Sequence, residues 1–319
     1  MPLPEAAIAI HNVSKTFGST KAVRDLSLKV PQGSLCGFLG PNGAGKSTTI
    51  RMIMSIIYPD AGSITVLGSD ALHHKDRIGY LPEERGLYRK MKVTDYLEYI
   101  ARLKGVERFE ARRRVREWLQ RIDLPSVERK KCEELSKGMQ QKAQFLAAII
   151  HEPDLLILDE PFSGLDPVNS QLLTDLIREM NRAGRTIIFS THVLHQAEIL
   201  CDRIFLINKG VKLLDATLDE IRSRFDPRTI VAEPLDGVVG FGAVPGVARV
   251  SPLAHSPKYE IEVHEGFDRQ RVMIDIVERH PVRSIELRRL SLEEVFVQMV
   301  LRDAGAEAAQ RAREELKHV

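Results

Sequence analysis

A glycine-rich loop between an apolar segment and a helix-forming segment constrains the fold of this chain most strongly. Residues 35–39 are apolar, as in a buried strand, and the residues after them have the spacing Gly, four residues, Gly-Lys-Ser. Glycines allow positive φ angles and close approach of the backbone, so that successive N–H groups and a helix N-terminus can bind an anion. The order strand, loop, helix therefore predicts an α/β fold with a phosphate-binding loop. The residues expected to contact phosphate are Gly40, Pro41, Asn42, Gly43, Ala44, Gly45, Lys46, Ser47 and Thr48.

The last residues of this loop indicate the chemistry of its ligand. Lys46 can reach the β- and γ-phosphates of a nucleotide, and the Ser47 hydroxyl can complete the ligand shell of a Mg²⁺ ion. A glycine-rich turn that binds nothing is the alternative, and the strand before the loop and the helix after it argue against it. The sequence therefore predicts a site for a nucleoside triphosphate and Mg²⁺.

A second apolar segment ends in two acidic residues. Residues 155–158 are wholly apolar, as expected for a parallel strand buried on both faces, and Asp159 and Glu160 follow them. We expect this strand to be the parallel neighbour of the strand before the phosphate loop, which places Asp159 near Mg²⁺. Glu160 then points toward the position of an attacking water, which a carboxylate can orient and deprotonate. A solvated loop that carries two acids is the alternative.

The composition of the chain limits the classes of function. A chain of 319 residues is too long for one small core, and a formal net charge of +2 gives no general reason to expect a nucleic-acid or membrane surface. The arginines within residues 107–121 are interleaved with glutamates, which favours a solvated helix face over a nucleic-acid site. The sequence starts without a signal-peptide pattern, its apolar runs are too short to cross a bilayer, and its three cysteines are scattered. We expect two domains in a reduced, cytosolic chain.

The first part of the chain alternates between strand and helix patterns, which predicts an α/β domain over 1–225. Two strands within 8–30, connected by 14–25, are expected to form an antiparallel edge sheet. The helix after the phosphate loop is expected to reach residue 57, and apolar residues at helical spacing predict a helical subdomain at about 90–145. Further short strands are expected at 63–67, 78–81, 155–158, 186–189 and 204–208.

The last third of the chain differs in composition, with closely spaced prolines and several glycines. An alternating strand at 259–263, a helix at 269–279 and a strand at 284–288 predict a small α+β accessory domain over 226–302. The final residues, 303–319, are expected to be a polar tail. The residues of this region identify no ligand.

Shorter motifs follow the order found in one known family. The chain resembles the ATP-binding subunits of ABC transporters, which combine a phosphate loop with an LSGGQ signature, a loop that crosses to a partner subunit, a switch histidine and an aromatic ring beside adenine. The segment LSKGMQQ at 135–141 matches the signature, and SGLD at 163–166 matches the crossing loop. All motifs together cover about residues 8–225. The matching residues are Phe17, Ser136, Lys137, Gly138, Met139, Gln140, Asp166 and His192.

This resemblance implies a fold and a mechanism. The fold is an ABC-type P-loop NTPase with a mixed-sheet core, an antiparallel edge sheet and a helical subdomain, followed by the small α+β domain. Two copies of the chain would dimerise head to tail around two ATP molecules, each held between the phosphate loop of one copy and the signature of the other. Hydrolysis would release the dimer, with Glu160 as base and His192 holding the γ-phosphate and the water in line. The residues expected at Mg²⁺ are Ser47, Glu83 and Asp159.

The resemblance also implies a separate membrane-spanning permease, docked near residues 83–92, and hence a position at the cytoplasmic face of the inner membrane. Two departures from the family pattern, Glu83 in place of Gln and Lys137 in place of Gly, are expected to alter coupling or the ATPase rate. The sequence ERGLY at 84–88 is similar to bacterial efflux-type subunits of the sodium- and drug-export kind. Two alternatives stay open, a soluble ABC-type ATPase of translation or DNA maintenance and a weakly hydrolysing regulatory module. The transported substrate is not encoded in these motifs.

Overall fold

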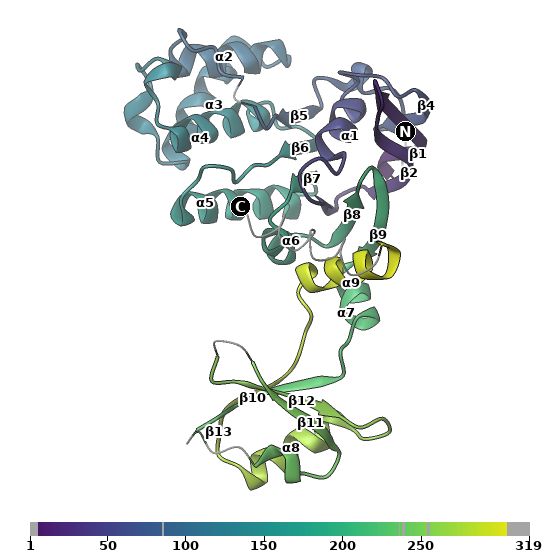
Figure 1. Cartoon of the computed structure of the whole chain (residues 1–319). Coiled ribbons are helices and arrows are strands. Elements are labelled where there is room, and N and C mark those ends of the chain that lie inside the picture. The colour runs from purple at the N-terminus through teal and green to yellow at the C-terminus, as the bar shows by residue number, and fades with distance from the viewer. Residues whose placement is uncertain (1–5, 85, 236, 238–239, 254–255, 305–319) are drawn as a thin grey trace. The chain divides into compact units, whose positions relative to one another are not determined.

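The computed structural model describes residues 6–304, apart from 85, 236, 238–239 and 254–255 (Figure 1). By contacts within the chain, it divides into two units. The first unit combines the residues up to Leu218 with those from Phe296 on, and the second unit is Asp219–Val295. Most of the polar tail expected at 303–319 lies outside the described residues, and the expected domain boundary at residue 225 stays a prediction. In the described part of the chain, no helix is both long and apolar enough to cross a bilayer.

A six-stranded sheet lies at the centre of the first unit. Its strand order is β5-β6-β7-β3-β8-β9, and all neighbouring strands are parallel except β8 and β9. β3, β6 and β7 consist entirely of buried residues, which agrees with the mainly apolar sequences of these strands. The bounds are β3 Leu35–Leu39, β5 Ile78–Leu81, β6 Leu155–Asp159, β7 Thr186–Thr191, β8 Arg203–Asn208 and β9 Val211–Thr217.

The expectation that β3 and β6 are direct neighbours is wrong, because β7 lies between them. Ser190 of β7 pairs with Phe38 of β3 on one side and with Asp159 of β6 on the other. All three strands run parallel, so their carboxyl ends still meet at one edge of the sheet, where the phosphate loop and Asp159 both lie. The sequence prediction also lacks β9, an edge strand that follows β8 after a two-residue turn.

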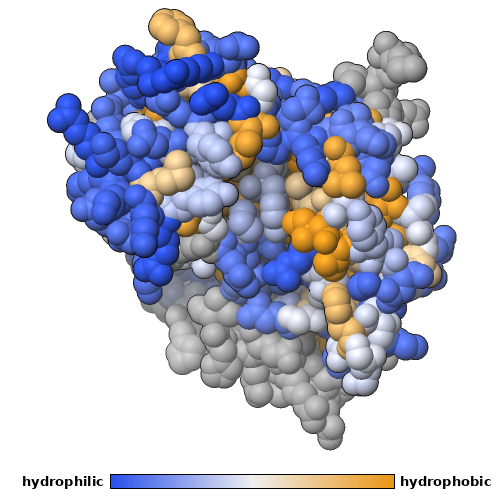
Figure 2. Space-filling model, turned by 90° about the horizontal axis from the view of Figure 1, so that it is seen from above, coloured by the Kyte–Doolittle hydropathy of each residue, from blue (hydrophilic) through white to orange (hydrophobic). Residues whose placement is uncertain are grey.

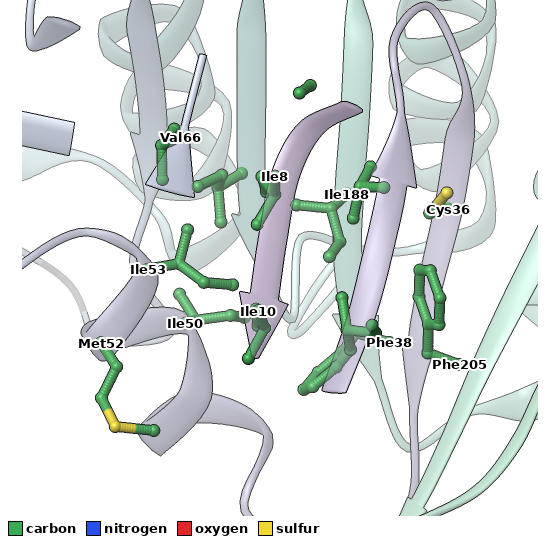
Figure 3. Packing of buried hydrophobic residues seen from close by; sticks show 14 of the residues in the cluster. Ile8, Ile10, Cys36, Phe38, Ile50, Met52, Ile53, Val66, Ile188 and Phe205 are labelled. Carbon is green, nitrogen blue, oxygen red and sulfur yellow. The ribbon is translucent and has the colours of Figure 1, made fainter. Parts of the chain in front are cut away.

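Helix α1 (Lys46–Ile53) packs its apolar residues into a buried cluster between this sheet and a second one. Figure 3 shows Ile50 of α1 beside Ile10, and Phe38 beside Phe205, whose ring centroids are 6.5 Å apart. The helix ends at Ile53 and does not reach residue 57 as expected. Ser55 has φ +53°, a left-handed conformation that a helix cannot continue.

The second sheet of this unit is antiparallel and has the order β2-β1-β4. Its strands are β1 Ala6–Phe17, β2 Thr20–Pro31 and β4 Ala61–Val66. The sequence predicts this hairpin but places a long connection at 14–25, which is wrong. Phe17 pairs directly with Thr20, and Gly18 with φ +56° makes the tight turn between them. Register shifts along β1 and β2 explain why their apolar alternation is irregular.

Helices α2 (Val93–Leu103), α3 (Arg108–Arg121) and α4 (Lys137–Ile149) lie together in the region expected to be a helical subdomain (Figure 1). Four of the six arginines of α3 pair with carboxylates; for example, Arg113 Nη1 lies 2.7 Å from Glu117 Oε1, and Arg114 Nε lies 2.6 Å from Glu110 Oε1. These ion pairs agree with a solvated helix face. The remaining helices of the unit are α5 Pro167–Arg182 and α6 Leu194–Leu200, and short 3₁₀ turns lie at Ala71–His74, Pro125–Val127 and Cys132–Glu134.

The second unit is built on a four-stranded antiparallel sheet of order β11-β12-β10-β13. Helix α8 packs on one face of this sheet, where Ile230, Ile261, Val272 and Ile276 are buried together. The strand expected at 259–263 and the helix expected at 269–279 are present, whereas β10 and β11 are missing from the sequence prediction. The elements are α7 Leu218–Arg224, β10 Thr229–Pro234, a 3₁₀ turn Phe241–Ala243, β11 Val247–Pro252, β12 Tyr259–Val263, α8 Arg269–Arg279, β13 Val282–Leu287 and α9 Leu292–Ala304, the first and last of which extend into the first unit.

Candidate functional site

The phosphate loop leaves the carboxyl end of β3 and continues into α1, as the sequence predicts. Gly45 has φ +104°, and a Cβ atom there would lie 2.5 Å from the Ala22 carbonyl oxygen. A Cβ atom on Gly40 would lie 2.1 Å from the Ile207 carbonyl oxygen. Gly45 is also the N-cap of α1 and has no side chain to bond the first-turn N–H groups. These N–H groups are therefore suited to bind an anion.

The ammonium group of Lys46 is held inside this loop. Its Nζ donates hydrogen bonds to the carbonyl oxygens of Gly40 at 2.8 Å and Pro41 at 3.3 Å. Glu160 Oε1 lies 3.9 Å from the same Nζ. Burial lowers the pKa of Lys46, and the nearby carboxylates, Glu160 above all, oppose that shift. A buried cation is thus placed where phosphate oxygens can replace carbonyl oxygens as its partners.

Three oxygen-bearing side chains meet beside the loop. Ser47 Oγ lies 3.4 Å from Asp159 Oδ1 and 3.5 Å from Glu83 Oε2. Asp159 also accepts a hydrogen bond from Ser190, and burial raises the pKa of its carboxyl group. Among the described residues, no cluster of three or more His, Cys, Asp or Glu side chains could hold a metal ion by itself. This set fits Mg²⁺, which prefers oxygen ligands and keeps substrate phosphates and waters in its shell.

The Glu160 carboxylate is held by the end of β7. Its Oε1 accepts a hydrogen bond from the His192 backbone N–H at 3.1 Å and lies 2.7 Å from His192 Nδ1. Its Oε2 accepts from the Thr191 hydroxyl at 3.3 Å. Glu160 has φ +50°, a conformation that side chains rarely adopt, and its N–H donates to the Ser190 carbonyl. Residues from two adjacent strands thus position one carboxylate next to the phosphate loop.

A cavity of about 610 Å³ surrounds the loop, a size typical of small-molecule sites. Phe17, expected beside adenine, is half exposed at 50% and does not line this cavity, although its strand partner Thr20 does. Its role stays a prediction. Sequence reasoning missed the β2 and β8–β9 contributions to the lining, and no local motif marks them. The lining residues are Thr20, Lys21, Ala22, Arg24, Asn42, Gly43, Ala44, Gly45, Lys46, Ser47, Thr48, Glu83, Glu160 and Lys209.

The signature and crossing-loop residues lie together elsewhere in the first unit. Ser136 is the N-cap of α4 and accepts a hydrogen bond from the Met139 N–H at 3.3 Å, and both Ser136 and Lys137 are exposed. A Cβ atom on Gly138 would touch Leu165 at 3.7 Å. The next residue, Asp166, is the N-cap of α5. None of residues 136–140 or 166 lines the phosphate cavity of the same chain, so the structure does not bring the two groups together.

Two family models match this chain. The model described as ABC transporter matches residues 23–163, and the model described as ATP-binding protein DrrA1-3-like, C-terminal domain, matches residues 217–300. The chain is 41% identical over 294 residues to an uncharacterized ABC transporter ATP-binding protein, YhaQ of Bacillus subtilis (strain 168), a match that covers 92% of this chain and 98% of the relative. It is 31% identical to the linearmycin resistance ATP-binding protein LnrL of the same strain, over 89% of this chain and 93% of the relative.

Solved structures share the fold. The dimeric structure of MJ0796, a bacterial ABC transporter cassette, aligns with a TM-score of 0.61 and 25% identity over 66% of this chain and 98% of that one. The mixed sheet, antiparallel sheet and helical part of the first unit are those of an ABC ATPase, which confirms the fold class expected from the sequence. The chain belongs to the family of ABC transporter ATP-binding subunits, whose members hydrolyse ATP.

Proposed function

We propose that this chain is the ATP-hydrolysing subunit of an ABC export system, in which two copies close around two ATP molecules and drive a separate membrane-spanning permease. The observation that carries the proposal is the position of Glu160. Its carboxylate lies 2.7 Å from His192 Nδ1 and 3.9 Å from Lys46 Nζ, at the end of the strand that also delivers Asp159. The carboxylate proposed as base therefore lies between its histidine partner and the lysine proposed to bind phosphate, and Glu160 and Lys46 both line the cavity.

This arrangement supports hydrolysis by an attacking water. In that step the water oxygen bonds to the γ-phosphorus, the bond from this phosphorus to the bridging oxygen breaks, and a water proton passes to Glu160. Lys46 neutralises charge on the phosphates, and His192 keeps the Glu160 carboxylate in place and can bond the γ-phosphate. When bound by Ser47, Asp159 and Glu83, Mg²⁺ would supply further positive charge to the phosphoryl oxygens.

A head-to-tail dimer accounts for the residues that lie outside this cavity. Ser136 and Lys137 are exposed at the N-terminus of α4, where first-turn N–H groups and the helix dipole can act on the γ-phosphate of a second copy. Gly138 lies against the loop that leads to Asp166, so one surface of the chain presents both elements to a partner. The solved ABC cassette cited above is itself dimeric, which supports the same assembly here.

An exposed aromatic cluster supports docking of a permease near residues 83–92. Tyr88 is 52% exposed, and its ring centroid lies 5.8 Å from that of Tyr99, which is 42% exposed. Seen from above, the side of the molecule that carries α2 and α3 is largely hydrophilic, and apolar side chains gather toward the middle of this face (Figure 2). Docking of the permease near residues 83–92 would place the chain at the cytoplasmic face of the membrane. Resistance and export relatives, such as LnrL and the Nod factor export ATP-binding protein I, support the direction of transport.

Replacing Glu160 with Gln tests the catalytic assignment. The amide keeps the shape of the side chain but cannot accept a proton, so steady-state ATPase activity should fall by roughly 10²–10⁴. ATP affinity should stay close to that of the wild type, and ATP should hold the variant as a dimer on size-exclusion chromatography.

Glu117→Gln, an exposed change on α3, serves as the control and should leave the ATPase rate unchanged. Wild-type turnover by the Glu160→Gln variant would contradict the role of Glu160. If the wild-type chain itself shows no turnover, alone or with a permease, the regulatory-module alternative is correct instead.

A further inference from the structure

Three cations of the cavity lining, Lys21, Arg24 and Lys209, have no place in the mechanism above. Arg24 of β2 and Lys209, at the turn between β8 and β9, both line the cavity around the phosphate loop. Within the described residues, neither side chain has an ion-pair or hydrogen-bond partner. In contrast, Arg112, Arg113 and Arg114 of α3 are all paired with glutamates. Arg24 and Lys209 therefore line the cavity without a partner from the described part of the chain.

The conformation of Lys209 is unusual for its residue type. Asn208 and Val211 pair directly, so Lys209 and Gly210 form a two-residue hairpin turn. Both have positive φ, +48° for Lys209 and +78° for Gly210, as in a type I′ turn. Such a turn favours Asn, Asp or Gly at both positions, and a lysine in the left-handed conformation raises the energy of the turn. Turn chemistry thus gives no reason for a lysine here, which points to a role for its side chain.

The turn is attached to the phosphate loop by its backbone. The Gly210 N–H donates to the Ala44 carbonyl at 2.8 Å, and the Gly210 carbonyl accepts from the Arg24 N–H at 2.8 Å. A Cβ atom on Gly210 would lie 2.7 Å from the Ala22 carbonyl oxygen, so the turn and β2 are in close contact. These bonds fix the position of Lys209 and Arg24 relative to the loop that binds phosphate.

The net charge of the residues that line the cavity also favours an anionic ligand. Lys21, Arg24, Lys46 and Lys209 are its cations and Glu83 and Glu160 its acids, which leaves a formal net charge of +2. Glu83 stands where the family usually has a neutral Gln, so this site carries one more negative charge near the phosphates than the family pattern. Extra cations in the same lining would offset that repulsion.

We propose that Lys209 and Arg24 are specificity-determining residues that contact the polyphosphate of ATP and offset the carboxylate of Glu83. This inference rests on the proposed function, since it assumes that the cavity binds ATP. The two side chains complete, from outside the phosphate loop, a ring of positive charge that begins with Lys46. Lys209 and Arg24 thereby strengthen the binding of nucleotides that carry several phosphates.

Lys209→Asn tests this contact in the full-length chain, because Asn fits the left-handed turn and the fold should survive. ATP affinity, measured by calorimetry at low ionic strength, should fall about 5–10-fold, and its dependence on salt should become weaker. Lys209→Arg should keep the affinity within about twofold, since the charge remains. Arg24→Gln provides an independent variant and should show the same loss.

Lys29→Asn, which removes an exposed cation of β2 that does not line the cavity, is the matched control and should bind ATP as the wild type does. Unchanged ATP affinity and salt dependence in both Lys209→Asn and Arg24→Gln would overturn the inference. Lys46→Ala, measured alongside, separates the two proposals. If it also binds ATP normally, the proposed function fails; if it loses binding while the other variants keep it, only this inference is wrong.

Discussion

The buried titratable side chains of the first unit differ in whether a group of opposite charge lies beside them. Lys46 and Asp159 lie beside groups of opposite charge at the phosphate loop. Burial lowers the pKa of Lys46 and raises the pKa of Asp159, so it favours the neutral form of each. His151 lies away from that site with no anion bonded to it. Its Nε2 contacts the Ile78 carbonyl at 3.2 Å, and its Nδ1 is buried without a partner among the described residues. The imidazole is therefore held neutral.

Acid should destabilise the chain through His151. Burial, aided by the charge of Lys104, lowers the pKa of His151 from 6.5 to about 4, so between these pH values the unfolded state binds a proton that the folded state does not. The free energy of unfolding should fall by about 3 kcal/mol from this group as the pH decreases from 7 to 4. His151→Gln should remove that part of the pH dependence in urea unfolding followed by fluorescence of Trp118, the only tryptophan.

The comparison uses the difference between variant and wild type at each pH, which cancels the titration of all other groups. His195→Gln is the control, because the His195 side chain is 78% exposed. A constant difference for His151→Gln from pH 7 to pH 4 would show that the histidine does not titrate as the structure indicates.

Packing between elements depends on small residues at points of close approach. Helix α4 lies against β5, and its Ala148 carbonyl oxygen would be 2.1 Å from a Cβ atom on Gly79. The same Cβ atom would be 2.9 Å from Leu156 of the neighbouring strand. Because a backbone carbonyl lies on one side and a buried strand on the other, neither neighbour can move aside for a methyl group at Gly79. Gly79 therefore sets the distance between the sheet and the helix that presents Ser136 at its other end.

Gly79→Ala should separate α4 from β5. We expect a loss of about 1–3 kcal/mol in the free energy of unfolding from overpacking, together with a lower ATPase rate because the N-terminus of α4 moves. Thermal unfolding and turnover measure the two effects. Gly86→Ala, where a Cβ atom meets nothing within 4 Å, should change neither. Equal stability of the two variants would contradict the close contact.

The first unit is built from two segments of the chain that are separated in sequence by the second unit. Residues 219–295 form the second unit, with its own buried cluster around Phe241, and the first unit resumes at Phe296. Phe296 is fully buried in α9. The stability of the ATP-binding unit therefore depends on residues near the end of the described chain.

Phe296→Ala tests this division of the chain. Loss of a buried aromatic side chain should cost about 3–5 kcal/mol, and Trp118 of the first unit should report that loss as an unfolding transition at lower denaturant. Phe241→Ala, an equally buried change in the second unit, should leave the Trp118 transition in place. The assignment of Phe296 to the first unit is wrong if the two variants shift this transition equally.

Much of the candidate site could be predicted from the spacing of residues close together in the sequence. The phosphate loop, the acidic end of β6 and the histidine after β7 each combine a strand pattern with polar residues a few positions away, and all three meet at one sheet edge in the structure. The strands β10 and β11 were missed because each is short and ends at a proline, and β9 because its edge position leaves it partly polar. The roles of Phe17, Ser136 and Asp166 stay predictions, because they require a nucleotide or a second copy.

The sequence by itself determined the family and the α/β fold class, and it predicts the phosphate-binding and acidic residues, because each of these rests on motifs of residues close together in the chain. Only the tertiary structure decided that β7 separates β3 from β6, that Lys209 reaches the phosphate cavity, and that Phe296 belongs to the first unit. These features depend on pairing between segments distant in sequence. Their energies come from packing and hydrogen bonds that no local pattern of residues encodes.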